Sequence, residues 1–312
     1  MVNLFFLHLT LIYCEIMILF ITGATGYLGS KCLDFLIDKN CIIHAVTRNS
    51  NIQSNHSIYW HNADILNLNQ TRLLIRSIKP THLLHLAWET EHNIYWDSDK
   101  NYDWVEASFR LISEFANCGG KRVVISGSCA EYQNNSMECF EYKSIINPST
   151  LYGKAKYLLY QKLINSNIIL SGNVKLTWCR IFSLFGGQEN QHRLFPYIVS
   201  SIKNNKTLVL KNQYLERDYS YYENICFYLV ELLFMNHSGI INLGSGRKIC
   251  IGELANLIIN YLNKDMKLLN HDDLNLPIND SLYANISILN RTNIPLLYEY
   301  NESIKLAVDN LI

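Results

Sequence analysis

The chain has 312 residues with 27 basic and 27 acidic side chains, so its formal net charge is zero. This balance excludes the strongly basic surface that nucleic acids and acidic membranes attract, and we expect neither as a partner. The nine cysteines form no C-x-x-C motif and no regular framework, which is typical of reduced thiols in a cytoplasmic protein.

Residues 1–16 are apolar, but they lack a basic start and a small-residue cleavage site, and polar residues interrupt them. A signal peptide or membrane anchor is therefore the weaker interpretation. The strand predicted at 17–22 follows with no room for a linker. We expect Met17 to begin the folded protein and residues 1–16 to form a dispensable extension.

Short apolar runs alternate with helical patterns through the first half of the chain, which is typical of a doubly wound parallel sheet. The strands are predicted at 17–22, 41–46, 57–60, 82–87, 122–126 and 175–180, and the helices at 27–38, 68–78, 101–117 and 151–166. We therefore expect an α/β domain of the Rossmann type over residues 17–180. Helix 101–117 carries apolar residues on more than one face, which predicts burial against the sheet and a partner subunit in a homodimer.

After residue 180 the pattern loosens. The helices predicted there are 193–203, 223–235, 251–262 and 301–311, and the strands are 207–210 and 239–243. We expect residues 181–312 to form a smaller α/β lobe that binds substrate and closes a cleft.

The apolar run at 17–22 leads into a glycine-rich turn and then a helical pattern. This arrangement holds a dinucleotide pyrophosphate at a helix N-terminus. Gly23 permits the tight turn, Gly26 lets backbone amides approach the phosphates, and Gly29 lets the helix pack on the strand. The cofactor-binding residues predicted in this turn are Gly23, Thr25, Gly26, Tyr27, Leu28 and Gly29.

Tyr152 and Lys156 lie one helical turn apart on the same face. A free phenol has a pKa of about 10, and a cation within about 4–6 Å favours the phenolate. This spacing indicates proton transfer by Tyr152 with Lys156 lowering its pKa. The alternative is an exposed pair on an ordinary helix, which the upstream glycine turn makes the weaker interpretation.

The second predicted strand ends in Thr47-Arg48, where an NAD enzyme usually places a carboxylate for the ribose 2′-hydroxyl. A guanidinium can instead bind the 2′-phosphate of NADP. NADP(H) is therefore favoured, NAD(H) stays possible, and the alternative is an Arg48 that faces solvent. No metal site is expected: His82 and His85 come closest to ligand spacing, but residues three apart on a strand face opposite sides.

Taken in order, these motifs resemble those of the extended short-chain dehydrogenase/reductases, in the group of nucleotide-sugar epimerases, dehydratases and reductases. The matching segments are Thr22-Gly-x-x-Gly-x-x-Gly29, Asp64-Ile65, His85-Leu-Ala-Trp88, Asn101, Ser126-Gly-Ser-Cys-Ala-Glu-Tyr132, Tyr152-x-x-x-Lys156, Arg217-Asp-Tyr219 and Asn242-Leu-Gly-Ser-Gly246. The ordered set is specific to the superfamily and much less specific to one reaction.

The resemblance implies several roles for residues outside the glycine turn. Ser128 is expected to be the catalytic hydroxyl, with Ser126 as the competitor because both lie on the same face of one strand. Lys156 is expected to hold the nicotinamide ribose as well as to support Tyr152. The other residues implied are Asp64, Ile65, Leu86 and Ala87 for the cofactor, and Trp88, Ser128 and Arg217 for the substrate.

Arg217 is expected to clamp the diphosphate of the sugar nucleotide. Its alternative is an ion pair with Asp218 or Glu216. The family's dehydratases carry an Asp-Glu pair directly after the catalytic hydroxyl, whereas this chain has Cys129 and Ala130 there. Glu131 comes one place too late and is expected to point elsewhere, so dehydration is disfavoured.

The favoured function is reduction of a nucleotide-activated 4-keto-6-deoxy sugar, because the 127–132 motif with Trp88 and Tyr95-Trp96 resembles deoxysugar 4-ketoreductases of surface-polysaccharide pathways. The first alternative is a nucleotide-sugar 4-epimerase that keeps NAD tightly bound. The second is a non-catalytic dinucleotide sensor. Sensors of this fold commonly lose the Tyr/Lys pair, which is intact here.

Overall fold

The computed structural model describes residues 16–91, 94–134, 137–210, 212–264, 269–270 and 281–311. Residues 1–15, on which the predicted N-terminal extension falls, lie outside this set. The first strand begins at Met17, as expected.

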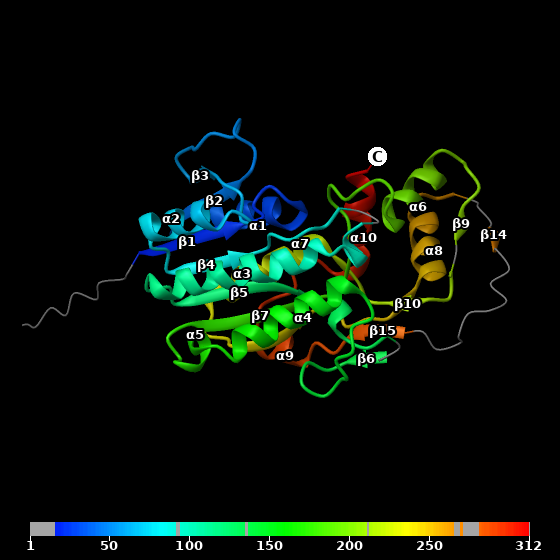
Figure 1. The fold of residues 1–312 in the computed structure, drawn as a ribbon. Helices are drawn as coiled ribbons and strands as arrows, with labels where there is room; N and C mark the ends of the chain where they lie inside the picture. Colours follow the sequence, from blue (N-terminus) through cyan, green and yellow to red (C-terminus); the bar gives the residue numbers. More distant parts are fainter. Residues whose placement is uncertain are drawn as a thin grey trace, which may run out of the picture.

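The central sheet has seven parallel strands in the order β12-β7-β5-β4-β1-β2-β3 (Figure 1). The strands are β1 (Met17–Thr22), β2 (Cys41–Thr47), β3 (Ile58–Asn62), β4 (His82–His85), β5 (Arg122–Ser128), β7 (Lys175–Ile181) and β12 (Gly239–Leu243). Because all run in one direction, their carboxyl ends meet at one edge of the sheet. The order reverses between β1 and β4, which is where ligands bind in open α/β sheets.

Helices cover both faces of the sheet, because successive strand residues point to opposite sides. Leu19 and Ile21 of β1 belong to a core shared with α1 (Tyr27–Ile37), α7 (Tyr222–Phe234) and α9 (Ser287–Arg291). Phe20 belongs to the core on the other face. That face is covered by α2 (Leu68–Ile78), α3 (Lys100–Asn117) and α4 (Leu151–Ile164), with the short α5 (Asn167–Leu170) after α4. The predicted doubly wound fold is confirmed.

The many apolar residues of α3 are buried within the chain itself. Trp104, Leu111, Ile112 and Phe115 are nine-tenths buried or more. The helix packs between α2 and α4 over the sheet. The two neighbouring helices therefore account for the burial of these four side chains, and the partner subunit stays a prediction.

The second half of the chain forms a smaller lobe and also returns to the central sheet. β12 pairs with β7, and α7 packs against α1. Figure 1 shows α6 (Leu194–Lys203), α8 (Ile251–Tyr261) and α10 (Tyr300–Asp309) grouped at one end of the sheet. These helices share one core, which includes Phe185, Val199 and Leu254.

Short strands complete the smaller lobe. One sheet has the order β13-β10-β15-β6, and two strand pairs are β11-β8 and β14-β9. Their bounds are β6 (Met137–Cys139), β8 (Ser183–Phe185), β9 (Val209–Leu210), β10 (Glu216–Arg217), β11 (Tyr219–Tyr221), β13 (Ile249–Cys250), β14 (Leu269–Asn270) and β15 (Ser281–Ala284). Apart from the 207–210 segment that contains β9, these strands were not predicted.

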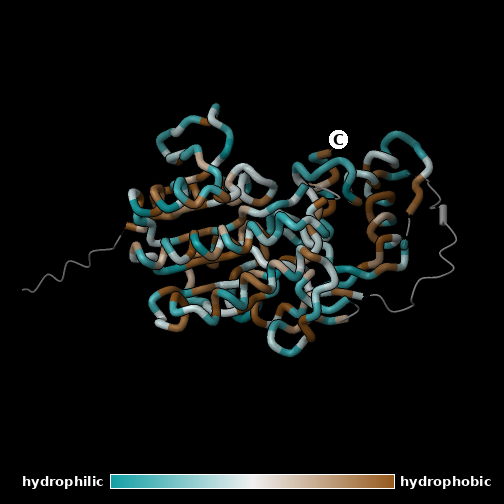
Figure 2. The backbone as a smooth tube through the Cα atoms, viewed as in Figure 1, coloured by the Kyte–Doolittle hydropathy of each residue, from teal (hydrophilic) through white to brown (hydrophobic). Residues whose placement is uncertain are grey.

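Hydropathy follows this layering: Figure 2 shows helices that alternate hydrophobic and hydrophilic residues along their turns. Among the described residues, no helix combines the length and apolarity needed to span a membrane. All eight cysteines of the described part are free thiols.

Candidate active site

The glycine turn joins β1 to α1 at the carboxyl edge of the sheet. Gly23 has φ +70°, and a Cβ there would lie 2.7 Å from the backbone nitrogen of Ala87. A Cβ on Gly29 would collide with the Gly23 carbonyl oxygen. Gly26 caps α1 without any side-chain hydrogen bond, so the first N–H groups of the helix stay open. An uncapped helix N-terminus behind a bare turn fits a dinucleotide pyrophosphate.

The other residues predicted in this turn are Thr25, Tyr27 and Leu28, and their side chains lie in different surroundings. Thr25 is exposed on the turn. The Tyr27 hydroxyl donates to the Gly186 carbonyl at 2.7 Å, and its ring stacks on Tyr222 at 5.3 Å between centroids. Leu28 packs into the core beneath α1. The backbone of Tyr27 and Leu28 therefore forms part of the turn, while their side chains pack α1 against the second half of the chain.

The neighbouring strand ends bring further predicted residues to this edge. Arg48 follows β2 with an exposed side chain, and among the described residues it forms no ion pair. Asp64 follows β3, where its Oδ1 accepts from the Leu66 N–H at 3.0 Å and Ile65 is buried. The sheet order sets β2 and β3 beside β1, so both loops lie on the side of the turn that an adenosine would extend along.

The segment after β4 borders the turn on its other side. Leu86 N–H donates to the Thr22 carbonyl at 3.2 Å, and Ala87 N–H donates to Thr22 Oγ1 at 3.3 Å. His85 uses both ring nitrogens, one with Thr22 Oγ1 at 2.7 Å and one with Ser108 Oγ at 2.8 Å. Both ring nitrogens are therefore engaged in hydrogen bonds within the protein. These bonds hold the Leu86–Ala87 backbone against Gly23.

Helix α4 carries Tyr152 and Lys156 into the same region. Lys156 is 2% exposed, and its Nζ donates to the Ser126 carbonyl at 2.8 Å. The same Nζ lies 3.8 Å from the centroid of the Trp88 ring and 5.8 Å from that of Tyr152. Burial lowers the pKa of Lys156 to about 7, which the Glu131 charge partly opposes.

The Tyr152 phenol has its pKa raised above the usual value of 10, mainly by burial and also by Tyr95, whereas a hydrogen bond to Ser128 acts in the lowering direction. The net shift is upward, opposite to the lowering expected from Lys156, because desolvation of the phenolate is its largest cause. The phenol stays protonated, which is the form that can donate a proton.

Ser128, rather than Ser126, lies at the phenol. Ser128 shares a hydrogen bond with Tyr152, and its Oγ accepts from the Ala130 N–H at 3.1 Å. Ser126 Oγ instead donates to the His85 carbonyl at 3.4 Å. Strand alternation could not separate these two serines. The short helix η2 (Cys129–Glu131) separates them by turning the chain directly after Ser128.

Glu131 points into the core, as expected. One of its oxygens accepts from the Ser128 N–H at 2.8 Å, and the other accepts from Arg180 Nε at 2.8 Å. Trp178 Nε1 donates to the same carboxylate at 2.9 Å. Glu131 and Arg180 are 0% and 1% exposed. The carboxylate is fully engaged beneath the site and fixes the backbone of Ser128.

Aromatic side chains surround Tyr152. Tyr95 and Trp96, on the short helix η1 (Tyr95–Asp97), meet its ring edge-to-face at 5.0 and 5.6 Å between centroids. Trp88, 8% exposed, meets it at 6.5 Å. Asn101 ties this wall together: it accepts from Trp88 Nε1 at 2.8 Å and donates to the Tyr95 carbonyl at 2.6 Å. The aromatic cluster between β4 and α3 was the sequence signal for this wall.

Arg217, on β10, carries its charge close to the site: burial raises the pKa of Cys129, the residue after Ser128, to about 12, and the Arg217 charge opposes this shift. Arg217 Nη1 donates to the backbone carbonyl of Glu216 at 2.8 Å. The carboxylates of Glu216 and Asp218 also have other partners. Glu216 pairs with Lys248 at 3.0 Å, and Asp218 accepts hydrogen bonds from Ser245 and Gly246. The alternative of an ion pair between Arg217 and Glu216 or Asp218 therefore stays a prediction.

A second cation was missed from the sequence. Arg193 precedes α6, and its guanidinium lies 5.9 Å from the Tyr27 ring and 3.5 Å from Glu189. Burial raises the pKa of Tyr95 and of Tyr219 to about 12, and the Arg193 charge opposes both shifts. Arg193 therefore lies near both tyrosines. No motif marked this arginine.

The fold and site together define an α/β enzyme with a Ser/Tyr/Lys cluster beside a dinucleotide turn. Residues 19–244 match the NAD dependent epimerase/dehydratase family. The chain belongs to this family and is an NAD-dependent enzyme of the epimerase/dehydratase type. No curated protein sequence matches it.

Several solved structures share the whole fold. UDP-glucose 4-epimerase from Thermotoga maritima has a TM-score of 0.82 at 16% identity, covering 94% of this chain and 98% of its own. UDP-N-acetylglucosamine 4-epimerase from Methanobrevibacter ruminantium has a TM-score of 0.78 at 19% identity, with coverage of 95% and 98%. dTDP-glucose 4,6-dehydratase from Bacillus anthracis, in complex with NAD, has a TM-score of 0.76 at 16% identity, with coverage of 94% and 96%. At these identities the likeness establishes the fold.

Proposed function

We propose that this protein reduces a nucleotide-activated 4-keto-6-deoxy sugar with NADPH in the cytoplasm, as a step of deoxysugar synthesis for surface polysaccharides. The observation that carries the proposal is the convergence of Ser128, Tyr152 and Lys156 at the carboxyl edge of the sheet, beside the glycine turn. The free thiols of the described cysteines support a reducing compartment.

When bound, a nicotinamide dinucleotide would supply the hydride that reduces the carbonyl carbon. Tyr152 donates its proton to the carbonyl oxygen, and its raised pKa keeps the phenol protonated until then. Ser128 donates a hydrogen bond to the same oxygen as negative charge develops on it. Lys156 holds the ribose hydroxyls and, when charged, stabilises the phenolate that Tyr152 leaves behind.

The cofactor choice rests on the end of β2. Arg48 is exposed there with no ion-pair partner among the described residues, so its guanidinium can bind the 2′-phosphate of NADP. The open N-terminus of α1 would hold the pyrophosphate, and the Asp64–Ile65 loop would border the adenine. Neither Thr47 nor Arg48 carries a carboxylate that would repel this phosphate.

Substrate recognition is assigned to the opposite side of the Ser/Tyr/Lys cluster. Arg217 and Arg193 would neutralise the diphosphate of a nucleotide sugar, since Arg binds phosphate oxygens bidentately. The sugar would pack against Trp88, Tyr95 and Trp96, where an apolar methyl at C6 suits an aromatic wall better than a hydroxymethyl group.

Dehydration lacks its acid-base pair. Cys129 and Ala130 stand at the two positions after Ser128, and the Glu131 carboxylate is held by Arg180 and the Ser128 backbone. A group so engaged in the core cannot reach the sugar to expel water.

A nucleotide-sugar 4-epimerase with tightly bound NAD is the second candidate. It is supported by the similar structures, since two of the three named above are UDP-sugar 4-epimerases. The same Ser128, Tyr152 and Lys156 would serve both reactions. An epimerase returns the hydride to the opposite face of the sugar, so it consumes no cofactor.

The test is to incubate the purified protein with NADPH or NADH and a panel of nucleoside-diphosphate 4-keto-6-deoxy hexoses, following the nicotinamide absorbance. The proposal expects stoichiometric NADPH oxidation with at least one substrate and formation of the 4-hydroxy sugar. An enzyme that purifies with NAD and interconverts two sugar alcohols without cofactor consumption would establish the epimerase instead.

A further inference from the structure

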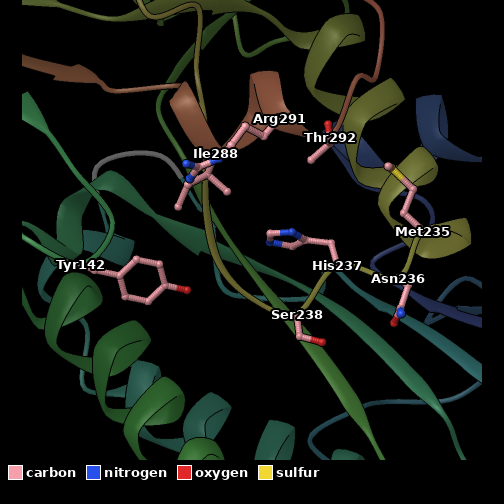
Figure 3. A pocket seen from close by; sticks show the side chains of 8 residues that line it. All are labelled: Tyr142, Met235, Asn236, His237, Ser238, Ile288, Arg291 and Thr292. Carbon is pink, nitrogen blue, oxygen red and sulfur yellow. The ribbon is translucent and has the colours of Figure 1, made fainter.

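A cavity of about 430 Å³ opens at the edge of the central sheet where β12 begins. Figure 3 shows its lining side chains, which come from three segments: Tyr142, the loop before β12, and the end of α9. It therefore lies at the amino end of a strand, whereas Ser128 and the glycine turn lie at the carboxyl edge. Its volume falls within the range of small-molecule sites.

His237 stands at the centre of this cavity with a fixed backbone. Its carbonyl accepts from Arg122 Nη2 at 2.8 Å and from Thr177 Oγ1 at 2.9 Å. Its Nε2 atom is buried and has no hydrogen-bond partner among the described residues. Burial and the Arg122 charge lower the pKa of the imidazole, so it is neutral at pH 7. Buried polar atoms of this kind are nearly always paired, by protein, water or ligand.

Two further donors face the same space in Figure 3. Arg291, at the end of α9, forms no ion pair within the described parts of the chain. Burial raises the pKa of the nearby Glu141 carboxyl, and the Arg291 charge is among the interactions that oppose this shift. The Glu141 carboxyl accepts a hydrogen bond from the Asn242 N–H at 3.0 Å. The Tyr142 hydroxyl accepts from the Ile240 N–H at 2.9 Å, which leaves its own proton free to donate.

The class of ligand is inferred from the charge and the apolar surface of the cavity. Its eight lining residues include one cation and no carboxylate, and Ile288 and Met235 add apolar surface. A guanidinium and a phenol that line the same cavity as a half-buried imidazole suit an oxyanion, and the apolar side chains suit a carbon skeleton. We propose that this cavity is a second binding site, separate from the Ser128–Tyr152–Lys156 site, for a small organic oxyanion such as a phosphate ester or carboxylate.

The probe compounds are phenyl phosphate and benzoate, which share an apolar body and differ in the oxyanion, with benzyl alcohol as the neutral control. The readout is the methyl NMR spectrum of the full chain labelled with ¹³C-methyl methionine. The sequence has five methionines, and Met235 lines the cavity. Its signal is assigned from its loss in Met235→Leu.

The proposal expects a saturable shift of the Met235 methyl signal with phenyl phosphate, benzoate or both, and none with benzyl alcohol. A response to phenyl phosphate alone assigns phosphate esters, and a response to benzoate alone assigns carboxylates. Arg291→Gln should weaken this binding about tenfold or more, since it removes a charge-assisted pair.

The matched control is Arg72→Gln on α2, an exposed arginine of the helix that connects β3 to β4 at the far edge of the sheet. It should bind as the parent does. Arg291 is itself exposed, so its variant is expected to fold, and the remaining methionine signals verify this. A Met235 signal that does not move with either oxyanion, or an Arg291→Gln variant that binds as tightly as Arg72→Gln, would overturn the proposal.

Discussion

Lys156 provides a test of the site's electrostatics that needs no substrate. Its ordinary pKa is 10.5, and burial lowers it to about 7 in the folded chain. Between these values the unfolded chain binds a proton that the folded chain does not. The free energy of unfolding, as far as it depends on Lys156, is therefore greatest above pH 10.5, falls as the pH drops toward 7, and levels off below 7.

The size of this effect follows from the two pKa values. Linkage gives a destabilisation of about 2 kcal/mol at pH 9 and about 4 kcal/mol at pH 7, since each pKa unit is worth about 1.4 kcal/mol. The parent protein should thus lose about 2 kcal/mol more stability between pH 9 and pH 7 than Lys156→Met, which has no proton to bind at this position. Loss of the bond to the Ser126 carbonyl adds an offset that does not vary with pH.

The assay is urea unfolding at pH 7, 8 and 9, followed by tryptophan fluorescence. Lys154→Met is the matched control, because Lys154 is exposed on the same helix and should keep the parent's pH dependence. If the curves of the parent and of Lys156→Met stay parallel over this range, the pKa of Lys156 is not depressed and its burial has been misjudged.

Three further substitutions test separate parts of the account. Tyr152→Phe should reduce turnover at least about 100-fold while leaving the dinucleotide Kd unchanged, because only the transferable proton is lost; retained activity in a steady-state assay would remove Tyr152 from the mechanism. Arg48→Ala should weaken NADPH binding about tenfold or more and leave NADH nearly unaffected, as measured by calorimetry; equal losses for both cofactors would contradict the 2′-phosphate contact. Glu131→Gln should destabilise the fold by about 3–5 kcal/mol in urea unfolding, because it leaves the Arg180 charge buried and uncompensated, and an unchanged midpoint would refute that ion pair's role.

Much of the fold was predictable because its signals are local. The strand-turn-helix sequence at 17–38 and the alternation of apolar runs up to residue 180 gave elements that match the structure within a few residues. The short strands β6, β10, β13 and β15 were not predictable, since they have two to four residues each and depend on pairing between distant segments. The same holds for the return of β12 to the central sheet.

The candidate site divides in the same way. Glycine spacing and the Tyr152/Lys156 interval identified residues that the structure brings together. The contact that separates Ser128 from Ser126 depends on η2, and the position of Arg193 depends on how the second half folds over the first. The direction of the Tyr152 pKa shift was not predictable, because a one-turn spacing reveals the nearby cation but not the burial that raises the pKa.

The central claim is that hydride from the nicotinamide ends in the product while Tyr152 supplies the proton. It is tested most directly by reduction with NADPH carrying deuterium in place of the transferable hydrogen. The account predicts one deuterium at C4 of the product sugar for each NADPH oxidised, with no transfer by Tyr152→Phe. Interconversion of two sugar alcohols on bound NAD, with no deuterium incorporated from added NADPH, would contradict it.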